Sequence, residues 1–308
     1  MPTDTRAPEA IGRRARLELR FEIRCGRTVA THTYAEPPLR IGRVLDLGGA
    51  AYVILVCSGP GIFGGDEFTY NVHVARGARV VLTSQAALQA HPSSLSALPS
   101  APPALPSALP AFPPSIPAFP PSRPPALCRQ EYIVEADAEL HCDWDPLIPF
   151  AGARIDQRFD LHLARGGRLF WSDALMAGRV SRGEAWRFEA LSHELALRTG
   201  ERLSYLERYT IAPAEGRVDR PWVADGARYF ATALVHHSDA TAEVAETWQR
   251  EAAAATGTVQ VGVDAVAPAL VVARFVAADG APFGRARASY RAAALRDIFR
   301  SPELAMRK

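Results

Sequence analysis

The sequence has few of the residues that mark a disulfide scaffold, a metal site or a membrane protein. Only four of its 308 residues are cysteine, at positions 25, 57, 128 and 142, and none of them forms a C-x-x-C pair. Such spacing argues against a zinc or redox motif and indicates buried thiols in a reducing compartment. The longest apolar run, 50–57, is too short to cross a bilayer, and residues 1–14 lack the apolar core of a signal peptide. We therefore expect a cytoplasmic protein that does not enter a membrane.

The chain also lacks a strong excess of charge of either sign. Its formal net charge is +2, and 22% of its residues are charged, which is ordinary for a folded domain. A nearly neutral chain has no broad electrostatic attraction to a polyanion, so we expect no nucleic-acid partner.

A dinucleotide-binding loop is missing as well, although Gly59, Gly61 and Gly64 spell G-x-G-x-x-G. The motif needs a helix after the glycines and an acidic residue about 20 positions later. Residues 67–74 instead alternate between polar and apolar, which predicts a strand, and no acid follows in 78–88. Gly61, Gly64 and Gly65 are therefore interpreted as a structural corner, where positive φ or close backbone approach requires glycine.

No catalytic residue is identified. The segment H-E-L-A-L, 193–197, begins like a zinc-protease helix, but Leu197 stands where the second histidine must be. A G-x-S-x-G nucleophile elbow is absent, and the adjacent His236 and His237 would point to opposite faces of a strand. These absences favour a binding protein over an enzyme.

Two carboxylates remain as candidates for acid–base or hard-cation chemistry. Asp143 and Asp145 in D-W-D-P-L-I-P-F are two residues apart, so on a strand they share a face. Because no third ligand or catalytic group is recognised beside them, we favour the simpler interpretation that they end a strand that turns at Pro146.

Strand patterns dominate what is present. Residues 16–24 place Leu17, Leu19, Phe21 and Ile23 on one face of a half-buried strand. A strand, a turn of small residues and a new apolar alternation recur at 74–82, 134–142, 163–171 and 198–206. This repeat predicts a mainly β fold of stacked strands in β-solenoid-like layers. Two helices are expected in the C-terminal half, one after a cap at Ser238 or Asp239 and one over 284–299.

A proline-rich segment, 92–126, interrupts the strands. Thirteen of its residues are proline and almost none is charged, so it predicts an extended or disordered insertion in a single domain that spans 1–308. The folded parts on either side are then expected to be contiguous.

Three stretches together resemble the UreD (UreH) family of urease accessory proteins. They are G-P-G-I-F-G-G-D-E-F-T-Y-N-V-H-V-A-R-G-A-R-V-V-L-T-S-Q-A-A (59–87), the segment from D-P-L-I-P-F-A-G-A to A-G-R (145–179), and S-R-G-E-A-W-R-F-E-A-L (181–191). The G-G-D corner, the T-S-Q-A run and the D-P-x-I-P-F-x-G-A segment occur in the family's order. Leu88 and Gln89 depart from it, because a lysine usually follows T-S-Q-A.

The resemblance implies a non-enzymatic maturation factor that binds UreF, UreG and apo-urease subunits and helps nickel enter the urease active site. It also implies transient nickel without a stably bound cofactor or dedicated metal site, and leaves self-association through the accessory complex open. Candidate nickel-path or partner residues are Asp66, Asp143, Asp145, Asp173, Arg179 and Glu184, all but Asp143 within the matching segments. The alternatives from other classes are a β-solenoid carbohydrate-active enzyme and a generic protein-binding scaffold.

Overall fold

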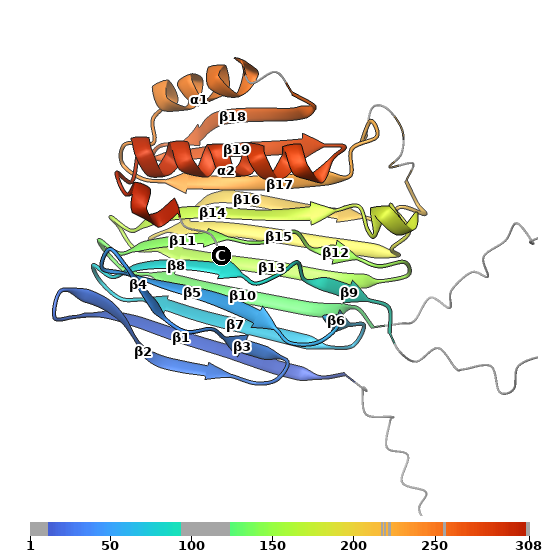
Figure 1. Cartoon of the computed structure of the whole chain (residues 1–308), viewed down its shortest axis with the longest axis horizontal. Helices are drawn as coiled ribbons and strands as arrows, with labels where there is room; N and C mark the ends of the chain where they lie inside the picture. Colours follow the sequence, from blue (N-terminus) through green and yellow to red (C-terminus); the bar gives the residue numbers. More distant parts are fainter. Residues whose placement is uncertain are drawn as a thin grey trace, which may run out of the picture.

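The chain folds mainly into β-strands, which Figure 1 shows stacked from the N-terminal region in blue to the C-terminal helices in orange and red. The computed structural model describes residues 12–93, 124–216, 218, 220, 223–254 and 257–305. Within them, the prediction of a mainly β fold with two α-helices in the C-terminal half is confirmed. Most of the proline-rich segment, 94–123, lies outside the described residues. The assignment of 1–308 to a single domain stays a prediction.

One sheet of the described chain has seven strands. In spatial order they are β16 (Arg202–Ile211), β15 (Ala190–Thr199), β13 (Arg154–Leu163), β10 (Ala126–Val134), β7 (Glu67–Val74), β1 (Arg14–Arg24) and β2 (Arg27–Ala35). Neighbours from β1 to β15 are parallel, whereas β2 and β16 pair antiparallel at the two edges. Because side chains alternate between the faces of a strand, residues paired in register form rows that cross each face of the sheet.

A second sheet in the described residues has nine strands. Its order is β18 (Val259–Ala267), β19 (Leu270–Ala277), β17 (Tyr229–His236), β14 (Arg168–Met176), β11 (Glu139–Asp143), β8 (Arg79–Ser84), β5 (Ala50–Cys57) and β3 (Leu39–Ile41), with β4 (Leu45–Leu47) also paired to β5. A small third sheet joins β12 (Ile148–Pro149), β9 (Gln89–His91) and β6 (Ile62–Phe63).

Short turns carry the chain from the first sheet to the second. Three of the four repeated segments are such turns, from β7 to β8, β10 to β11 and β13 to β14. The fourth, 198–206, is different, because it is an antiparallel hairpin of β15 and β16 within one sheet. The sheets are not closed, and the solenoid-like layering suggested by the repeat is not confirmed.

The space between the two large sheets holds the main core. Leu17, Leu19 and Phe21 of β1 are buried there as predicted. Ile23 is not, since 44% of it is exposed: the pairing of β1 with β7 ends at Phe21, so β1 projects beyond its neighbour. Fully buried Trp171 of β14 fills the centre and meets the ring of Phe159 from the opposite sheet at 5.0 Å between centroids.

Two helices cover the outer face of the second sheet in the C-terminal half (Figure 1). They are α1 (Ala242–Ala254) and α2 (Gly280–Asp297); two short 3-10 turns, η1 (Val180–Arg182) and η2 (Pro302–Ala305), complete the described helical elements. The predicted cap of the first helix was wrong, because Val244 donates its backbone N–H to the Thr241 hydroxyl. The second helix begins at Gly280, four residues before the predicted start.

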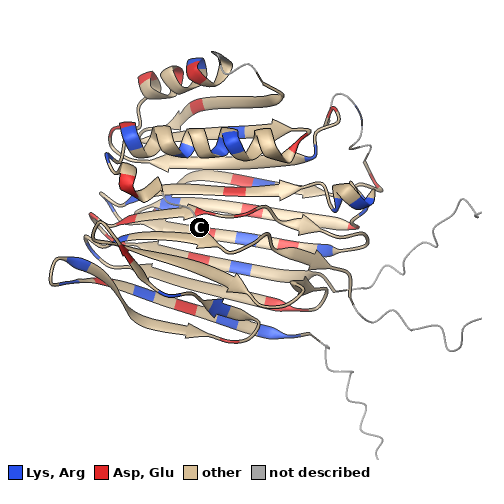
Figure 2. Cartoon of the chain, in the orientation of Figure 1, with Lys and Arg blue, Asp and Glu red and all other residues tan. Residues whose placement is uncertain are grey.

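Acidic and basic residues are interspersed along the strands, as the coloured ribbon in Figure 2 shows. Mixed signs of this kind agree with the small net charge of the chain. Exposed ion pairs such as Arg158–Asp160 contribute at most ~1 kcal/mol each, so they are compatible with the fold rather than its cause.

Candidate functional site

Polar side chains interrupt the apolar core along two facing rows. In the first sheet, Gln157, His193 and Tyr209 are paired in register across β13, β15 and β16. In the second sheet, Asp173 of β14 lies in register with Thr232 of β17. Burying polar groups costs free energy unless they find partners, so a polar strip between sheets indicates a functional constraint.

A cavity of about 270 Å³ opens between these rows. Its polar lining consists of Gln157, Asp173, His193, Glu207, Tyr209, Thr232 and Arg274. A second cavity of about 80 Å³ continues toward β5 and β8, with a polar lining of Tyr70, Ser84, Gln130, Trp144, Asp145, Gln157 and Asp173, and Cys57 beside them. Gln157, Asp173 and Ala174 line both cavities, so Asp173 lies at their junction.

Asp173 is the carboxylate at this junction. Trp171 donates its indole N–H to Oδ1 at 3.1 Å, and His193 Nε2 lies 3.9 Å from Oδ2. Burial raises the pKa of Asp173 above its ordinary value. Its second oxygen faces the imidazole at a distance too long for a hydrogen bond.

His193 faces Asp173 from the opposite sheet. It is 3% exposed, and its ring stacks on Tyr209 with 4.7 Å between centroids. Among the described residues, neither ring nitrogen of His193 has a hydrogen-bond partner. The H-E-L-A-L segment lies on strand β15 rather than on a zinc-protease helix, and its histidine lines the cavity.

Glu207 closes the far side of the larger cavity. It accepts hydrogen bonds from the Tyr205 hydroxyl at 2.7 Å, from the Thr232 hydroxyl and from Arg274 Nη1 at 3.0 Å. Sequence reasoning missed both Glu207 and Arg274. The available signal was a single charge in an alternating strand pattern, since Glu207 falls between Tyr205 and Tyr209 on the inward face.

Asp145 lies on the wall of the smaller cavity. Its carboxylate accepts a hydrogen bond from the Ser84 hydroxyl at 3.0 Å, and its backbone N–H donates to the Ser84 hydroxyl oxygen at 2.9 Å. Trp144 also lines this cavity, and its buried indole N–H has no partner in the described part of the chain. The smaller cavity thus presents both acceptors and a donor.

Asp143, by contrast, points away from the cavities. Arg287 of α2 donates to its carboxylate at 3.1 Å, and both side chains are buried. β11 ends at Asp143, so the strand alternation does not continue to Asp145. The favoured interpretation, a strand that ends before Pro146, is therefore confirmed, and Asp143 and Asp145 do not share a strand face.

The other predicted acids have backbone or ion-pair partners outside the two cavities. Asp66 accepts backbone hydrogen bonds from Arg13 at 2.7 Å and Phe63 at 3.0 Å. Glu184 pairs with Arg179, whose Nε lies 2.7 Å from Oε2. The hydrogen bond from the Arg179 guanidinium lowers the pKa of Glu184. Of the six predicted residues, only Asp145 and Asp173 line a cavity described above.

The glycine corner combines positive φ with close backbone approach. Gly61 has φ +123° and Gly65 has φ +94°. A Cβ on Gly64 would lie 2.9 Å from Ser93 N and 3.0 Å from Pro124 O, so these two residues both lie beside this glycine. The corner therefore positions the two flanks of the proline-rich segment next to each other.

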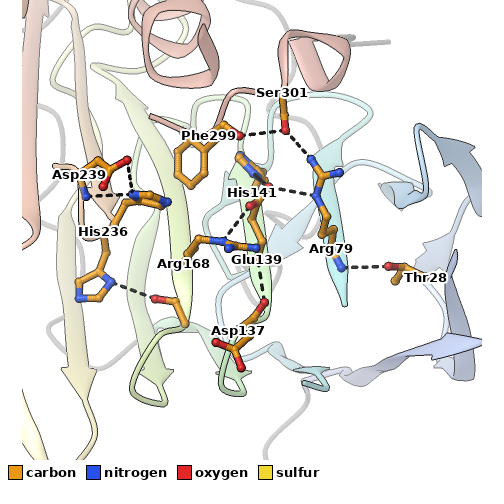
Figure 3. Close-up of polar contacts among 12 residues, drawn as sticks. Thr28, Arg79, Asp137, Glu139, His141, Arg168, His236, Asp239, Phe299 and Ser301 are labelled. Atoms are coloured by element: carbon orange, nitrogen blue, oxygen red, sulfur yellow. Dashed lines mark hydrogen bonds and ion pairs between the residues drawn. The ribbon is translucent and has the colours of Figure 1, made fainter. Parts of the chain in front are cut away.

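A separate buried cluster lies under the C-terminal segment, at the other end of the strands (Figure 3). Glu139 accepts a hydrogen bond from His141 at 2.8 Å and pairs with Arg168 at 3.0 Å. Arg79 joins it to the end of the chain by donating to the Ser301 hydroxyl at 2.6 Å. These contacts tie the C-terminal segment to the second sheet, so we interpret the cluster as an anchor.

No three His, Cys, Asp or Glu side chains among the described residues are placed to hold a metal ion together. No helix within the described ranges is both long and apolar enough to span a membrane. The inter-sheet cavities are therefore the strongest candidate site, and they offer dispersed oxygen and nitrogen ligands rather than a closed metal centre.

Comparison with known proteins supports one family. The family model described as UreD urease accessory protein matches residues 13–308. A urease accessory protein UreD of Sorangium cellulosum is 31% identical over 65% of this chain and 54% of its own length. One from Deinococcus radiodurans is 26% identical over 98% of both chains, and one from Lysinibacillus sphaericus is 28% identical over 68% of both. The chain therefore belongs to the UreD family of urease accessory proteins.

Proposed function

We propose that this protein is a non-enzymatic urease maturation factor that works in the cytoplasm. It binds apo-urease together with UreF and UreG, and assists the entry of nickel into the urease active site. The family description, which names an accessory protein rather than an enzyme, supports this proposal.

The observation that carries the nickel part is the junction at Asp173. Two cavities between the sheets share this carboxylate and Gln157, and their linings supply Ser84 and Asp145 on one side and His193 and Glu207 on the other. Nickel is the cargo here, and the polar linings are its temporary ligands. Carboxylate and hydroxyl oxygens bind Ni²⁺ more weakly than nitrogen or thiolate ligands do, so a cation can move from one to the next.

A carbohydrate-active enzyme is the weaker alternative. Such an enzyme needs two carboxylates flanking an open groove that accepts a sugar. Here the side chain of Asp173 is only 14% exposed, and Arg274 and Tyr205 donate hydrogen bonds to the carboxylate of Glu207. A generic scaffold, the other alternative, gives no reason for the polar strip.

The function is tested by coexpressing urease subunits, UreF and UreG with and without this chain. We expect urease activity and urease-bound nickel only in its presence, and expect the chain to copurify with UreF and the urease subunits. Full urease activity without the chain, or the absence of copurification, would contradict the proposal.

A further inference from the structure

The two large sheets differ in width, so the end of the wider sheet extends past the narrower one. The seven-stranded sheet ends at β16, whereas the nine-stranded sheet continues past β17 to β19 and β18 (Figure 1). Arg274 of β19 reaches Glu207 of β16, so β19 faces the last strand of the narrower sheet and β18 lies beyond it. On the face of β18 that continues the row of Arg274, the exposed residues are Gln260, Gly262 and Asp264.

β16 is a free edge of the narrower sheet. In the described chain it pairs only with β15, although it is 10 residues long. Two of its apolar residues, Leu203 and Leu206, are 45% and 44% exposed. A long edge strand with exposed apolar side chains presents unpaired backbone N–H and C=O groups, which another strand can pair with.

The edge of the wider sheet, by contrast, is covered. Gln249 of α1 accepts a hydrogen bond from the backbone N–H of Val263 in β18 at 2.6 Å. A side-chain amide thus occupies a backbone group that a further strand would use. The uncovered edge of β16 is therefore not a general feature of these sheets.

Gly262 lies in the middle of β18, opposite Arg274. Its φ is not positive, and a Cβ built on it would meet nothing within 4 Å. Neither the backbone conformation nor a neighbour in the described chain therefore requires glycine at this position. A glycine inside a strand often marks a place where another backbone approaches closely.

Arg274 indicates which chemical group an approaching segment should carry. Its side chain is 55% exposed, and its Nη1 and Nη2 donate to Glu207 and to the Tyr205 hydroxyl. Its Nε has no hydrogen-bond partner among the described residues. A guanidinium with a spare N–H near solvent can pair with a carboxylate, so an acidic side chain complements this position.

A second copy of this chain does not fit the free edge. Antiparallel pairing of two β16 strands would place both copies in one continuous sheet. Because β18 and β19 extend past β16 in each copy, these strands would then compete for the same space in the facing layer. A single extended segment is narrow enough to avoid this clash.

We propose that β16 is a docking edge for an extended segment of a partner protein, which pairs with it as an additional strand. The segment lies against the exposed face of β18 and β19, passes close to Gly262 and places an acidic side chain beside Arg274. This inference rests on the proposed function, because the partner is taken to belong to the assembly with UreF, UreG and the urease subunits.

The first test is amide hydrogen exchange of the full chain, alone and in the purified assembly with UreF, UreG and the urease subunits. About half of the amides of an edge strand point away from its neighbour and exchange freely until another strand pairs with them. We expect exchange within β16 to slow at least about tenfold in the assembly. Exchange within β2, at the opposite edge of the same sheet, should not change.

The second test blocks the space beside the edge. Gly262→Trp places a large side chain where the segment would lie, in a strand that accepts aromatic residues, so it should weaken assembly at least about tenfold. The matched control is Gly284→Trp on α2, where a Cβ also meets nothing within 4 Å, and it should assemble like the original chain. Arg274→Met should weaken assembly severalfold, and thermal unfolding shows whether each variant is folded.

An assembly in which β16 exchanges as fast as in the free chain would overturn the inference. Equal slowing in β2 and β16 would do so too, since it would indicate general tightening of the fold. Normal assembly of Gly262→Trp, or equal losses in Gly262→Trp and Gly284→Trp, would also contradict it, and unchanged assembly of Arg274→Met would remove the acidic contact. Failure of the proposed function is recognised separately, because the original chain would then form no assembly at all.

Discussion

Asp173 and His193 face each other across the two sheets, with 3.9 Å between Oδ2 and Nε2. Asp173 belongs to β14 of the nine-stranded sheet and His193 to β15 of the seven-stranded sheet. The distance between them therefore depends on how the two sheets pack. Trp171, two residues from Asp173, is fully buried and helps fix this spacing. Other polar contacts between the two sheets in the larger cavity are shorter, such as that from Arg274 Nη1 to Glu207 at 3.0 Å.

The buried ion pair of α2 should be important for stability. Replacing Arg287 by Met leaves the buried carboxylate of Asp143 without its guanidinium, and such a loss costs about 3–5 kcal/mol. Urea unfolding measures the change. Arg208→Met, which removes an exposed arginine, should change the free energy of unfolding by less than about 0.5 kcal/mol. Equal effects of the two substitutions would contradict the importance of the buried pair.

The glycine corner allows a matched comparison of two residues with positive φ. Gly59 has φ +132° and open space around a would-be Cβ, whereas a Cβ on Gly61 would lie 2.1 Å from Gln89 O. Gly59→Ala should therefore cost only the backbone strain of about 1–2 kcal/mol. Gly61→Ala should cost at least about 2 kcal/mol more, because backbone atoms must move. Similar unfolding midpoints for the two variants would show that the approach to Gln89 is not needed.

Acid should weaken the anchor under the C-terminal segment. Burial raises the pKa of Glu139, but the hydrogen bond from His141 and the charges of Arg79 and Arg168 outweigh this effect and lower the pKa to about 2. A carboxylate whose folded pKa is depressed stabilises the protein above its unfolded pKa, and that contribution disappears as the pH falls from 4.5 toward 2. The loss is up to about 3 kcal/mol.

Urea unfolding at pH 7 and at pH 3 tests this linkage with Glu139→Gln as the control. The variant has no carboxylate at this position, so the difference in stability between the original chain and the variant should shrink at the lower pH. A difference that stays constant would show that Glu139 has the same pKa in the folded and unfolded chain.

The proline-rich segment should be dispensable for folding. Ser93 and Pro124 lie beside the same glycine, so a short Gly/Ser linker can join them in place of 94–123. Loop-closure entropy changes slowly with length, so stability should change by only ~1 kcal/mol. Thermal unfolding is the measurement, and a fall in the midpoint of more than about 10 °C would show that the segment packs against the fold.

Strand periodicity was sufficient to predict much of the fold. Phe68, Tyr70, Val72 and Val74 alternate in the sequence and are buried in β7 as that pattern requires. The hairpin at 198–206 could not be distinguished from the earlier turns, because both begin with a strand and a small-residue turn. Whether the next strand joins the same sheet depends on pairing partners that are distant in the sequence.

The site was only partly predictable for the same reason. Asp173 was selected through motifs resembling a known family, whereas His193 was dismissed because its neighbours fail a zinc-protease pattern. Glu207 and Arg274 lie 67 residues apart in the chain and meet only because β16 and β19 belong to facing sheets. For both Glu207 and Arg274, the local signal was a single charged residue among the apolar or aromatic residues on the inward-facing side of a strand.

The central claim, that a cation moves between the sheets during urease maturation, is tested most directly at the junction of the cavities. Asp173→Asn keeps the size of the side chain but removes the charge that both cavities share. The matched control is Asp137→Asn, since Asp137 has a 69% exposed side chain and only a weak surface pairing with Arg76. Asparagine also tolerates the positive φ of 62° at that position.

The measurement is the nickel content of urease purified from cells that coexpress each variant with UreF, UreG and the urease subunits. Copurification of the variant with its partners serves as the control for folding and assembly. The account predicts that Asp173→Asn assembles normally but lowers urease-bound nickel severalfold, while Asp137→Asn loads urease fully. Full nickel loading by Asp173→Asn would contradict it.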